Sequence, residues 1–113
     1  TDVDALTAEE AVIFCGWSMK KGALFGSWPR YFALRRDRTL SYYEEVGKSN
    51  ELKLGGAVDL GTLSAIKRER PISETDFTFR IVTAGATLRV DPGSKSAFDK
   101  WQEGLMAAVS ASW

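Results

Sequence analysis

The sequence predicts a mainly β fold in which seven antiparallel strands curl into a sandwich or partly open barrel, capped by one C-terminal amphipathic helix. Three observations predict this class. Residues 12–91 contain seven short apolar or alternating runs, each bounded by Gly, Pro, Asp or Asn. Turn sequences separate neighbouring runs, which favours antiparallel pairing. The last segment changes to helical spacing, and a helix is well suited to close one end of a curled sheet.

Each element has its own local signal. Thr7, followed three residues later by Glu10, forms a capping-box pattern, so we expect a short helical turn before the first strand. The strands are expected at residues 12–20, 28–36, 40–46, 57–60, 63–67, 77–82 and 86–91. Two turns are clear, at residues 36–39 and at Ala84-Gly85, where Gly can supply the positive φ of a tight hairpin.

The closing helix is predicted after the Asp-Pro-Gly stretch at 91–93, with a length of roughly four turns. Ser94 and Ser96 are both suitable N-caps. Apolar residues then recur at helical spacing with charged residues between them: Phe98, Trp101, Leu105, Ala108 and Val109. We expect Trp101 to lie in the core.

The length and composition predict one folded domain. A chain of 113 residues can build one sizeable core, and 44% hydrophobic with 27% charged residues is typical of a globular protein. We expect residues 1–11 to be an N-terminal extension and residues 12–113 to be the domain. No apolar run approaches the roughly 20 residues of a membrane helix. Because the chain begins with Thr, we expect it to be a piece of a longer protein.

The charge balance argues against a nucleic-acid binder, because fifteen bases are matched by fifteen acids. The charges are unevenly placed, however. Residues 1–15 carry four acids and no base. Residues 20–38 contain one acid, Asp37, and six bases: Lys20, Lys21, Arg30, Arg35, Arg36 and Arg38. A locally positive face is therefore predicted.

The residues needed for most catalysis and metal binding are missing. The chain has no His and a single cysteine, Cys15, so the commonest general base and the usual zinc ligands are lacking. Val-Gly-Lys-Ser at 46–49 is no phosphate loop, because Tyr42 stands where that motif needs Gly. We expect no catalytic residue, no metal site and no cofactor. Cys15 is predicted to be a buried, inert thiol in a reducing compartment, the cytosol.

Several runs together resemble a pleckstrin homology (PH) domain over about residues 13–110. They are GWSMKK, SWPRYFAL, TLSYYEE, GGAVDL and FTFRIVTAGATLRV, followed by a helix with Trp101 in SAFDKWQEGL. The resemblance implies a strongly bent seven-stranded barrel capped by the C-terminal helix. It also implies a ligand site at the opposite, open end, where members of the family bind phosphoinositide headgroups between the first two loops.

The resemblance also implies individual site residues. Lys20 and Arg30 match the first and last positions of the family's basic signature, whereas the middle position is Trp28, which is not basic. Tyr42 falls where members place a Tyr hydroxyl against a phosphate. Further charge is expected from three lysines, the last two of them in the loop after the third strand: Lys21, Lys48 and Lys53.

Strand alternation places Arg30 on the same face as Phe32 and Leu34, so Arg30 should point into the mouth of the barrel if those two are core. Arg35, Arg36 and Arg38 belong to the hairpin at the far end of that strand. At ~3.3 Å per residue they are more than about 15 Å away, so we exclude them from this pocket.

The loop at residues 22–26 carries two large apolar side chains, Leu24 and Phe25, between cationic strand ends. Two interpretations remain open. Both side chains insert into the headgroup and acyl boundary of a membrane, or the loop folds back and buries them over the barrel.

Two functions follow from the sequence. The first is a module that binds phosphoinositide headgroups and recruits a larger signalling protein to the cytosolic membrane face, where it associates peripherally. The alternative is a protein-interaction or autoinhibitory module that contacts a partner protein or a neighbouring domain; Trp28 and the zero net charge favour it. The run IKRER at 66–70 is interpreted as a solvated strand end, or else as part of a second anionic site.

Overall fold

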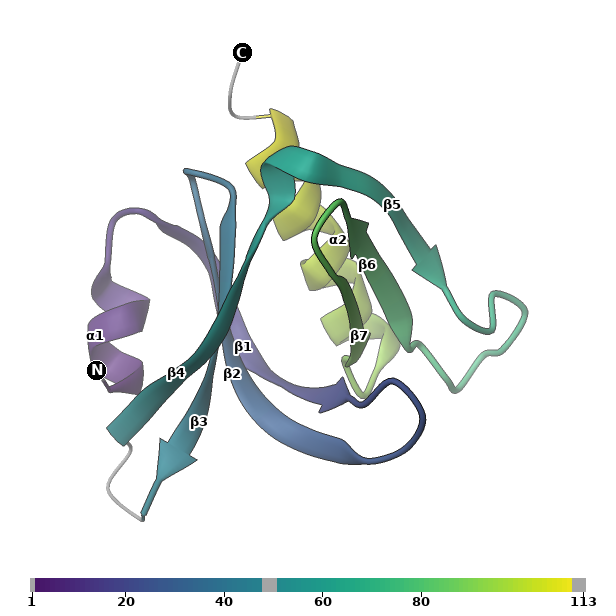
Figure 1. Ribbon diagram of the computed structural model, residues 1–113, viewed down its shortest axis with the longest axis horizontal. Helices are drawn as coiled ribbons and strands as arrows, with labels where there is room; N and C mark the ends of the chain where they lie inside the picture. The colour runs from purple at the N-terminus through teal and green to yellow at the C-terminus, as the bar shows by residue number, and fades with distance from the viewer. Residues whose placement is uncertain (1, 48–50, 111–113) are drawn as a thin grey trace.

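The computed structural model describes residues 2–47 and 51–110. They form one seven-stranded antiparallel sheet in the order β4-β3-β2-β1-β7-β6-β5, with a C-terminal helix (Figure 1). This confirms the predicted fold class. The elements are α1 Val3–Ala8, β1 Val12–Lys21, β2 Ser27–Arg35, β3 Thr39–Val46, β4 Glu51–Asp59, the 3-10 turn η1 Leu60–Thr62, β5 Leu63–Arg68, β6 Phe79–Thr83, β7 Thr87–Asp91 and α2 Lys95–Ser110.

Strand β1 joins the two halves of the sheet. It pairs with β2 over nearly its whole length, but it pairs with β7 only at Met19, Lys20 and Lys21. The β1–β4 half and the β5–β7 half therefore meet at the end of β1, and Figure 1 shows the sheet bending there. Helix α2 packs against β1 and β2.

The core is centred on Trp101 of α2, which is 1% exposed. Its ring lies 4.9 Å from that of Phe14, 5.0 Å from that of Phe32 and 5.6 Å from that of Phe79. The indole Nε1 donates a hydrogen bond of 2.9 Å to the buried hydroxyl of Ser18 on β1. The prediction that Trp101 is a core residue is confirmed.

A second apolar cluster lies on the outer face of the β1–β4 half. Leu6 of α1 is 1% exposed and packs with Tyr31, Ala33, Tyr43 and Leu52. The segment expected as an N-terminal extension thus covers part of the sheet.

The predicted capping box at Thr7 is wrong. Asp2 caps α1, its carboxylate accepting from the backbone N–H of Ala5, and the helix runs from Val3 to Ala8. Thr7 therefore lies inside the helix, where its hydroxyl donates to the carbonyl of Val3. The carboxylate at position 2 is a stronger cap because an aspartate accepts the orphan N–H directly at the positive end of the helix.

Strand β4 begins at Glu51, six residues before the predicted start at position 57. Gly55 and Gly56 suggested a loop, but both lie inside the strand, next to a register shift between Tyr42 and Tyr43. Glycine is needed at position 56 because a Cβ there would overlap the Tyr42 hydroxyl. The glycine pair thus leaves room for a ring and does not end the strand.

None of the described helices is long and apolar enough to cross a membrane.

Trp101→Ala should lower the free energy of unfolding by about 3–5 kcal/mol, because it empties the centre of the core and leaves Ser18 without its partner. Urea unfolding, followed by far-ultraviolet circular dichroism, measures this. Met106→Ala on the exposed face of the same helix should change it by no more than about 0.5 kcal/mol. Equal effects of the two substitutions would contradict this account of the core.

Candidate functional site

A pocket of about 470 Å³ lies near the β1–β2 loop. Side chains from β1 to β4 line it: Lys20, Arg30, Tyr42, Glu44, Lys53, Leu54 and Gly55. Four of the six residues predicted to contact a headgroup are in this lining. Alternation explains the convergence, because the pocket residues continue the faces that bear core residues deeper in the barrel.

Arg30 lies on the same face of β2 as Phe32 and Leu34, both fully buried, as alternation predicted. Its Nη1 donates a 2.8 Å hydrogen bond to the carbonyl of Pro29, and its Nη2 lies 3.5 Å from Oε2 of Glu44. The guanidinium is therefore oriented from both sides. Its remaining donors are available because the side chain is 22% exposed.

Lys20 and Tyr42 contact each other in the lining of the pocket. The Lys20 Nζ lies 5.3 Å from the centre of the Tyr42 ring, within the range of a cation–π contact. The ring is held between Phe32, at 6.0 Å, and the backbone of Gly55 and Gly56. Tyr42 thus helps to fix the position of a cation of the pocket.

The structure changes the predicted origin of Lys53. Lys53 does not come from the loop after β3 but from β4 itself, directly opposite Glu44 in the antiparallel register. The expectation of a loop lysine at this position is wrong because β4 begins earlier than predicted. Lys48 lies outside the described residues.

Lys21 does not join the pocket lining. As the next residue after Lys20 on β1, it points to the opposite face of the sheet. The pKa of Asp76 is lowered mainly by the hydrogen bond from the backbone N–H of Thr78, and the charges of Lys21 and Arg70 lower it further. Lys21 therefore faces the loop between β5 and β6.

The β1–β2 loop presents its apolar tip to solvent. Leu24 is 90% exposed and Phe25 is 84% exposed, so the fold-back interpretation is wrong. The backbone N–H of Gly22 donates to the carbonyl of Gly26 at 3.1 Å, which closes the loop without folding it over the barrel. Two large apolar groups thus project beside the pocket.

Trp28, at the non-basic position of the signature, supports this loop. Gly26 has a φ of +93°, and a Cβ there would lie 2.5 Å from Cη2 of the Trp28 indole. The ring therefore packs directly on the loop backbone, close to Gly22 as well. Trp28 therefore contributes to the shape of the loop at the position where the sequence resemblance implied a base.

None of the three bases of the far hairpin lines the pocket, as predicted, and two of them have partners elsewhere. Arg35 pairs with Glu9 at 3.0 Å and donates to the Tyr43 hydroxyl at 3.1 Å. Arg38 donates to the carbonyl of Val109 at the end of α2.

The run at 66–70 is only partly a solvated strand end. The Arg68 guanidinium lies 4.5 Å from the centre of the Phe77 ring and donates to the backbone carbonyls of Ser73 and Asp76. Glu69 accepts from Arg80 at 2.8 Å and from Arg89 at 2.5 Å. The hydrogen bond from Arg89 is the main reason that the pKa of Glu69 falls from 4.5 to about 2.

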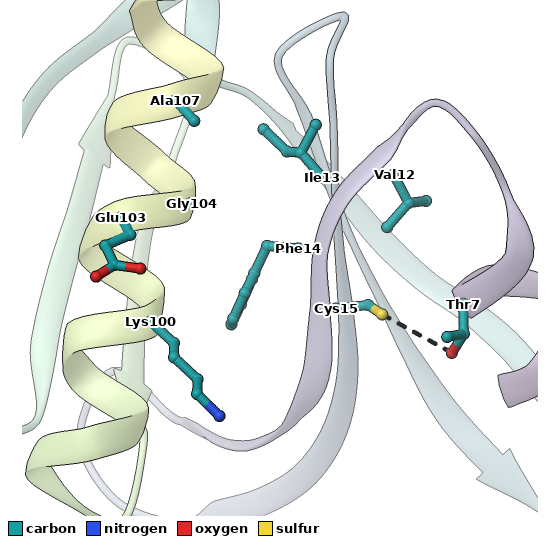
Figure 2. Close-up of a pocket in the computed structure, with 9 residues that line it drawn as sticks. All are labelled: Thr7, Val12, Ile13, Phe14, Cys15, Lys100, Glu103, Gly104 and Ala107. Atoms are coloured by element: carbon teal, nitrogen blue, oxygen red, sulfur yellow. Dashed lines mark hydrogen bonds between the residues drawn. The ribbon is translucent and has the colours of Figure 1, made fainter.

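A second cavity, of about 480 Å³, lies between α1, the first half of β1 and α2 (Figure 2). None of the residues predicted to bind a headgroup lines it. Cys15 lines it and is half-buried, with Sγ 3.9 Å from the Thr7 hydroxyl, so the prediction of a buried thiol is wrong. Lys100 and Glu103 of α2 give its opposite wall a mixed charge.

The family model described as "PH domain" matches residues 12–110. The chain belongs to the PH domain family. The seven antiparallel strands in one sheet and the C-terminal helix match the fold of this family. The resemblance stated from the sequence is confirmed.

Solved structures share this PH fold. The carboxyl-terminal PH domain of pleckstrin matches with a TM-score of 0.68 and 23% identity, over 86% of this chain and 95% of that one. A structure of inhibited Vav1 matches with a TM-score of 0.71 and 14% identity, over 86% of this chain but 26% of that one. The PH domain of human TBC1 domain family member 2 protein has a TM-score of 0.64 and 21% identity, over 84% and 78% of the two chains.

The sequence analysis missed three residues that line this pocket, Glu44, Leu54 and Gly55. The sequence could have predicted that Glu44 shares a face with Tyr42, because it lies two residues further along the same strand. It could not have predicted that Glu44 lies close to Arg30, because this depends on the pairing of β2 with β3.

The ion-pair cluster of Glu69 predicts how stability depends on pH. Because the pKa of Glu69 is depressed from 4.5 to about 2, its stabilisation is present above pH 4.5 and is lost as the pH falls towards 2. Glu69→Gln should be less stable than wild type at neutral pH, and the difference should shrink across that window. Urea unfolding at a series of pH values measures it.

Glu74→Gln is the matched control, since Glu74 is an exposed carboxylate of the loop between β5 and β6. Its stability difference from wild type should stay small at every pH. A difference for Glu69→Gln that is constant between neutral pH and about pH 2 would contradict the proposed role of the two arginines.

Proposed function

We propose that this PH domain binds the headgroup of a polyphosphorylated inositol lipid and thereby recruits the protein that contains it to the cytosolic face of a membrane. One observation carries the proposal: three bases from three strands, Lys20, Arg30 and Lys53, line a single pocket beside an exposed apolar loop tip.

The chemistry of the pocket suits a multiply charged phosphate ester. Lys20 and Lys53 supply point charges, and Arg30 supplies a planar fork that can bind two phosphate oxygens at once. The hydroxyl of Tyr42 adds a neutral donor. A structure of the pleckstrin domain in complex with D-myo-Ins(1,2,3,5,6)P5 supports the idea that this fold accommodates an inositol polyphosphate.

Glu44 sets how much negative charge a ligand needs in order to bind in the pocket. Its carboxylate lies 3.5 Å from Arg30 and opposite Lys53, so an incoming anion has to compete with it for both cations. A single phosphate offers little more charge than this carboxylate, whereas two or three phosphates on one ring offer considerably more. We therefore propose selectivity for polyphosphorylated headgroups over monophosphorylated ones.

Leu24 and Phe25 would supply the apolar part of the membrane contact. Burial of a large apolar side chain contributes roughly 1.5–3 kcal/mol, which is a tenfold or larger gain in affinity. Trp28 packs under the loop and limits its movement, so less entropy is lost on insertion. Headgroup binding and insertion together would give a reversible, peripheral association.

Arg30→Ala should weaken binding of inositol 1,3,4,5-tetrakisphosphate by about tenfold to a hundredfold, because a charge-assisted hydrogen bond contributes about 1.5–3 kcal/mol. Isothermal titration calorimetry measures this without a membrane. Arg36→Ala is the matched control, since it removes the same charge at the far hairpin. Wild type that binds neither this compound nor any phosphoinositide vesicle would overturn the proposed function.

Phe25→Ala should leave affinity for the free headgroup unchanged and lower affinity for phosphoinositide vesicles by about tenfold. Vesicle sedimentation at increasing salt separates the two contributions, since insertion persists when charge attraction is screened. Met106→Ala, an exposed apolar residue on α2, serves as the control. Equal vesicle binding by Phe25→Ala and wild type would show that Phe25 at the loop tip does not contribute to the membrane contact.

A protein-contact function is the second candidate, and the cavity of Figure 2 favours it. Within the described chain, β1 pairs with β7 only at residues 19–21, so the first half of β1 has an edge without a strand partner beside α2. An extended peptide could add to this edge. Peptides selected by display that shift the amide resonances of residues 12–18 would support this candidate, and peptides that shift only other residues would count against it.

A further inference from the structure

Trp17 lies on the outer face of β1, where two hollows of the surface meet. The larger hollow, of about 440 Å³, lies towards β3 and is lined by Glu44 and Glu45. The smaller hollow, of about 190 Å³, lies towards the end of β7 and is lined by Asp91. Trp17 and Pro29 line both. We call these two hollows together the Trp17 surface.

The indole of Trp17 is anchored and accessible at once. Trp17 faces outwards because its neighbour Ser18 faces the core, where it accepts the hydrogen bond from Trp101. The Trp17 ring packs against that of Tyr31 with centroids 5.2 Å apart and planes at 71°, yet Trp17 is 44% exposed. Tyr31 in turn belongs to the buried outer cluster under α1. Trp17 is therefore a positioned aromatic side chain of the kind that contributes most to protein contacts.

The Trp17 surface is acidic. Its lining contains three acids, Glu44, Glu45 and Asp91, and one base, Arg30. Arg30 already lies 3.5 Å from Glu44. Among residues 2–47 and 51–110, neither Glu45 nor Asp91 forms an ion pair. One carboxylate in each hollow is thus available to a cation.

The nearest bases on the same face do not neutralise these carboxylates. Lys21 faces the loop between β5 and β6, where its charge acts on Asp76. Arg89 pairs with Glu69 and donates a 2.6 Å hydrogen bond to the carbonyl of Gly22. The Trp17 surface therefore repels phosphate groups and an anionic bilayer, and it attracts a positively charged group.

The two available carboxylates lie too far apart for one ligand group to contact both. Met19 on β1 is directly opposite Asp91 on β7, whereas Glu45 is on β3, which pairs with β2. At about 4.8 Å between neighbouring strands, β3 and β7 are about 14 Å apart. An extended chain at ~3.3 Å per residue covers this distance in about four residues. Trp17 and Pro29, on the two strands between, lie beneath such a chain.

We propose that the Trp17 surface binds an extended segment of a partner protein that carries two arginines about four residues apart. One guanidinium pairs with Glu45 in the larger hollow and the other pairs with Asp91 in the smaller one, while one of them also stacks on Trp17. Arginine fits better than lysine, because its planar group stacks on an aromatic ring and forms two hydrogen bonds with a carboxylate. The inference does not depend on headgroup binding, and it concerns a different surface from the edge of β1.

The probe is a five-residue peptide, blocked at both ends, with arginine at its first and last positions and Gly-Pro-Gly between them. Its titration into ¹⁵N-labelled protein should shift the Trp17 indole resonance and the amide resonances of residues 17–19 and 91. The same peptide with citrulline for arginine keeps the shape without the charge, and it should bind at least about tenfold more weakly. A peptide of the same composition with adjacent arginines reaches one carboxylate, so it should bind about twofold to threefold more weakly.

The decisive variant is Glu45→Gln/Asp91→Asn, which removes both charges and keeps the side-chain sizes. It should weaken binding of the arginine peptide about fivefold to tenfold. Glu74→Gln/Glu103→Gln is the matched control, since it removes two exposed acids from other parts of the surface, and it should bind like wild type. Trp17→Leu keeps an apolar side chain but removes the aromatic face, and it should weaken binding about twofold to fivefold.

Four results would overturn the inference: equal affinity of wild type for the arginine and citrulline peptides, equal affinity for the two arginine spacings, equal binding by the two double variants, or wild-type binding by Trp17→Leu. If Trp17→Leu does not fold, the double variants decide. Calorimetry with inositol 1,3,4,5-tetrakisphosphate should give the same affinity for wild type and Trp17→Leu. Failure of the headgroup pocket and failure of the Trp17 surface are therefore observed separately.

Discussion

The buried contact between Trp101 and Ser18 fixes the rest of the molecule. A single hydrogen bond joins α2 to β1 inside the core, and three aromatic rings surround the indole. Because Ser18 must face inward to accept this bond, every second residue of β1 faces inward as well. Lys20, two residues further along, is thereby directed to the inner face at the end of the strand, where the pocket lies.

The same alternation separates two adjacent lysines. Lys20 lines the pocket, whereas Lys21 lies on the opposite face of the sheet, and the loop with Leu24 and Phe25 begins directly after them. The apolar tip therefore projects from a loop that begins next to the pocket. A flat anionic bilayer offers complementary chemistry to the pocket and to the tip, since its headgroups carry charge and its acyl boundary accepts apolar side chains.

Two groups of bases each contain a carboxylate. Glu44 lies beside Arg30 in the pocket, and Glu69 joins Arg80 to Arg89, which are opposite each other on β6 and β7. These acids reduce repulsion between neighbouring bases in the folded protein while leaving an excess of positive charge. The net charge of zero for the whole chain is therefore compatible with a local excess of bases in the pocket and around Glu69.

The sequence by itself determined the strands, the amphipathic helix, the core role of Trp101 and the placement of Arg30 beside core residues, because these depend on periods of 2 and 3.6 residues within one element. Tertiary structure alone decided which distant residues meet. Glu44 reaches Arg30 and Lys53 enters the pocket only through strand register. Gly55 and Gly56 led to the wrong predicted start of β4, because local propensity does not show that the Tyr42 ring occupies the space next to these two residues. Register depends on pairing between strands far apart in the chain, and no local pattern contains it.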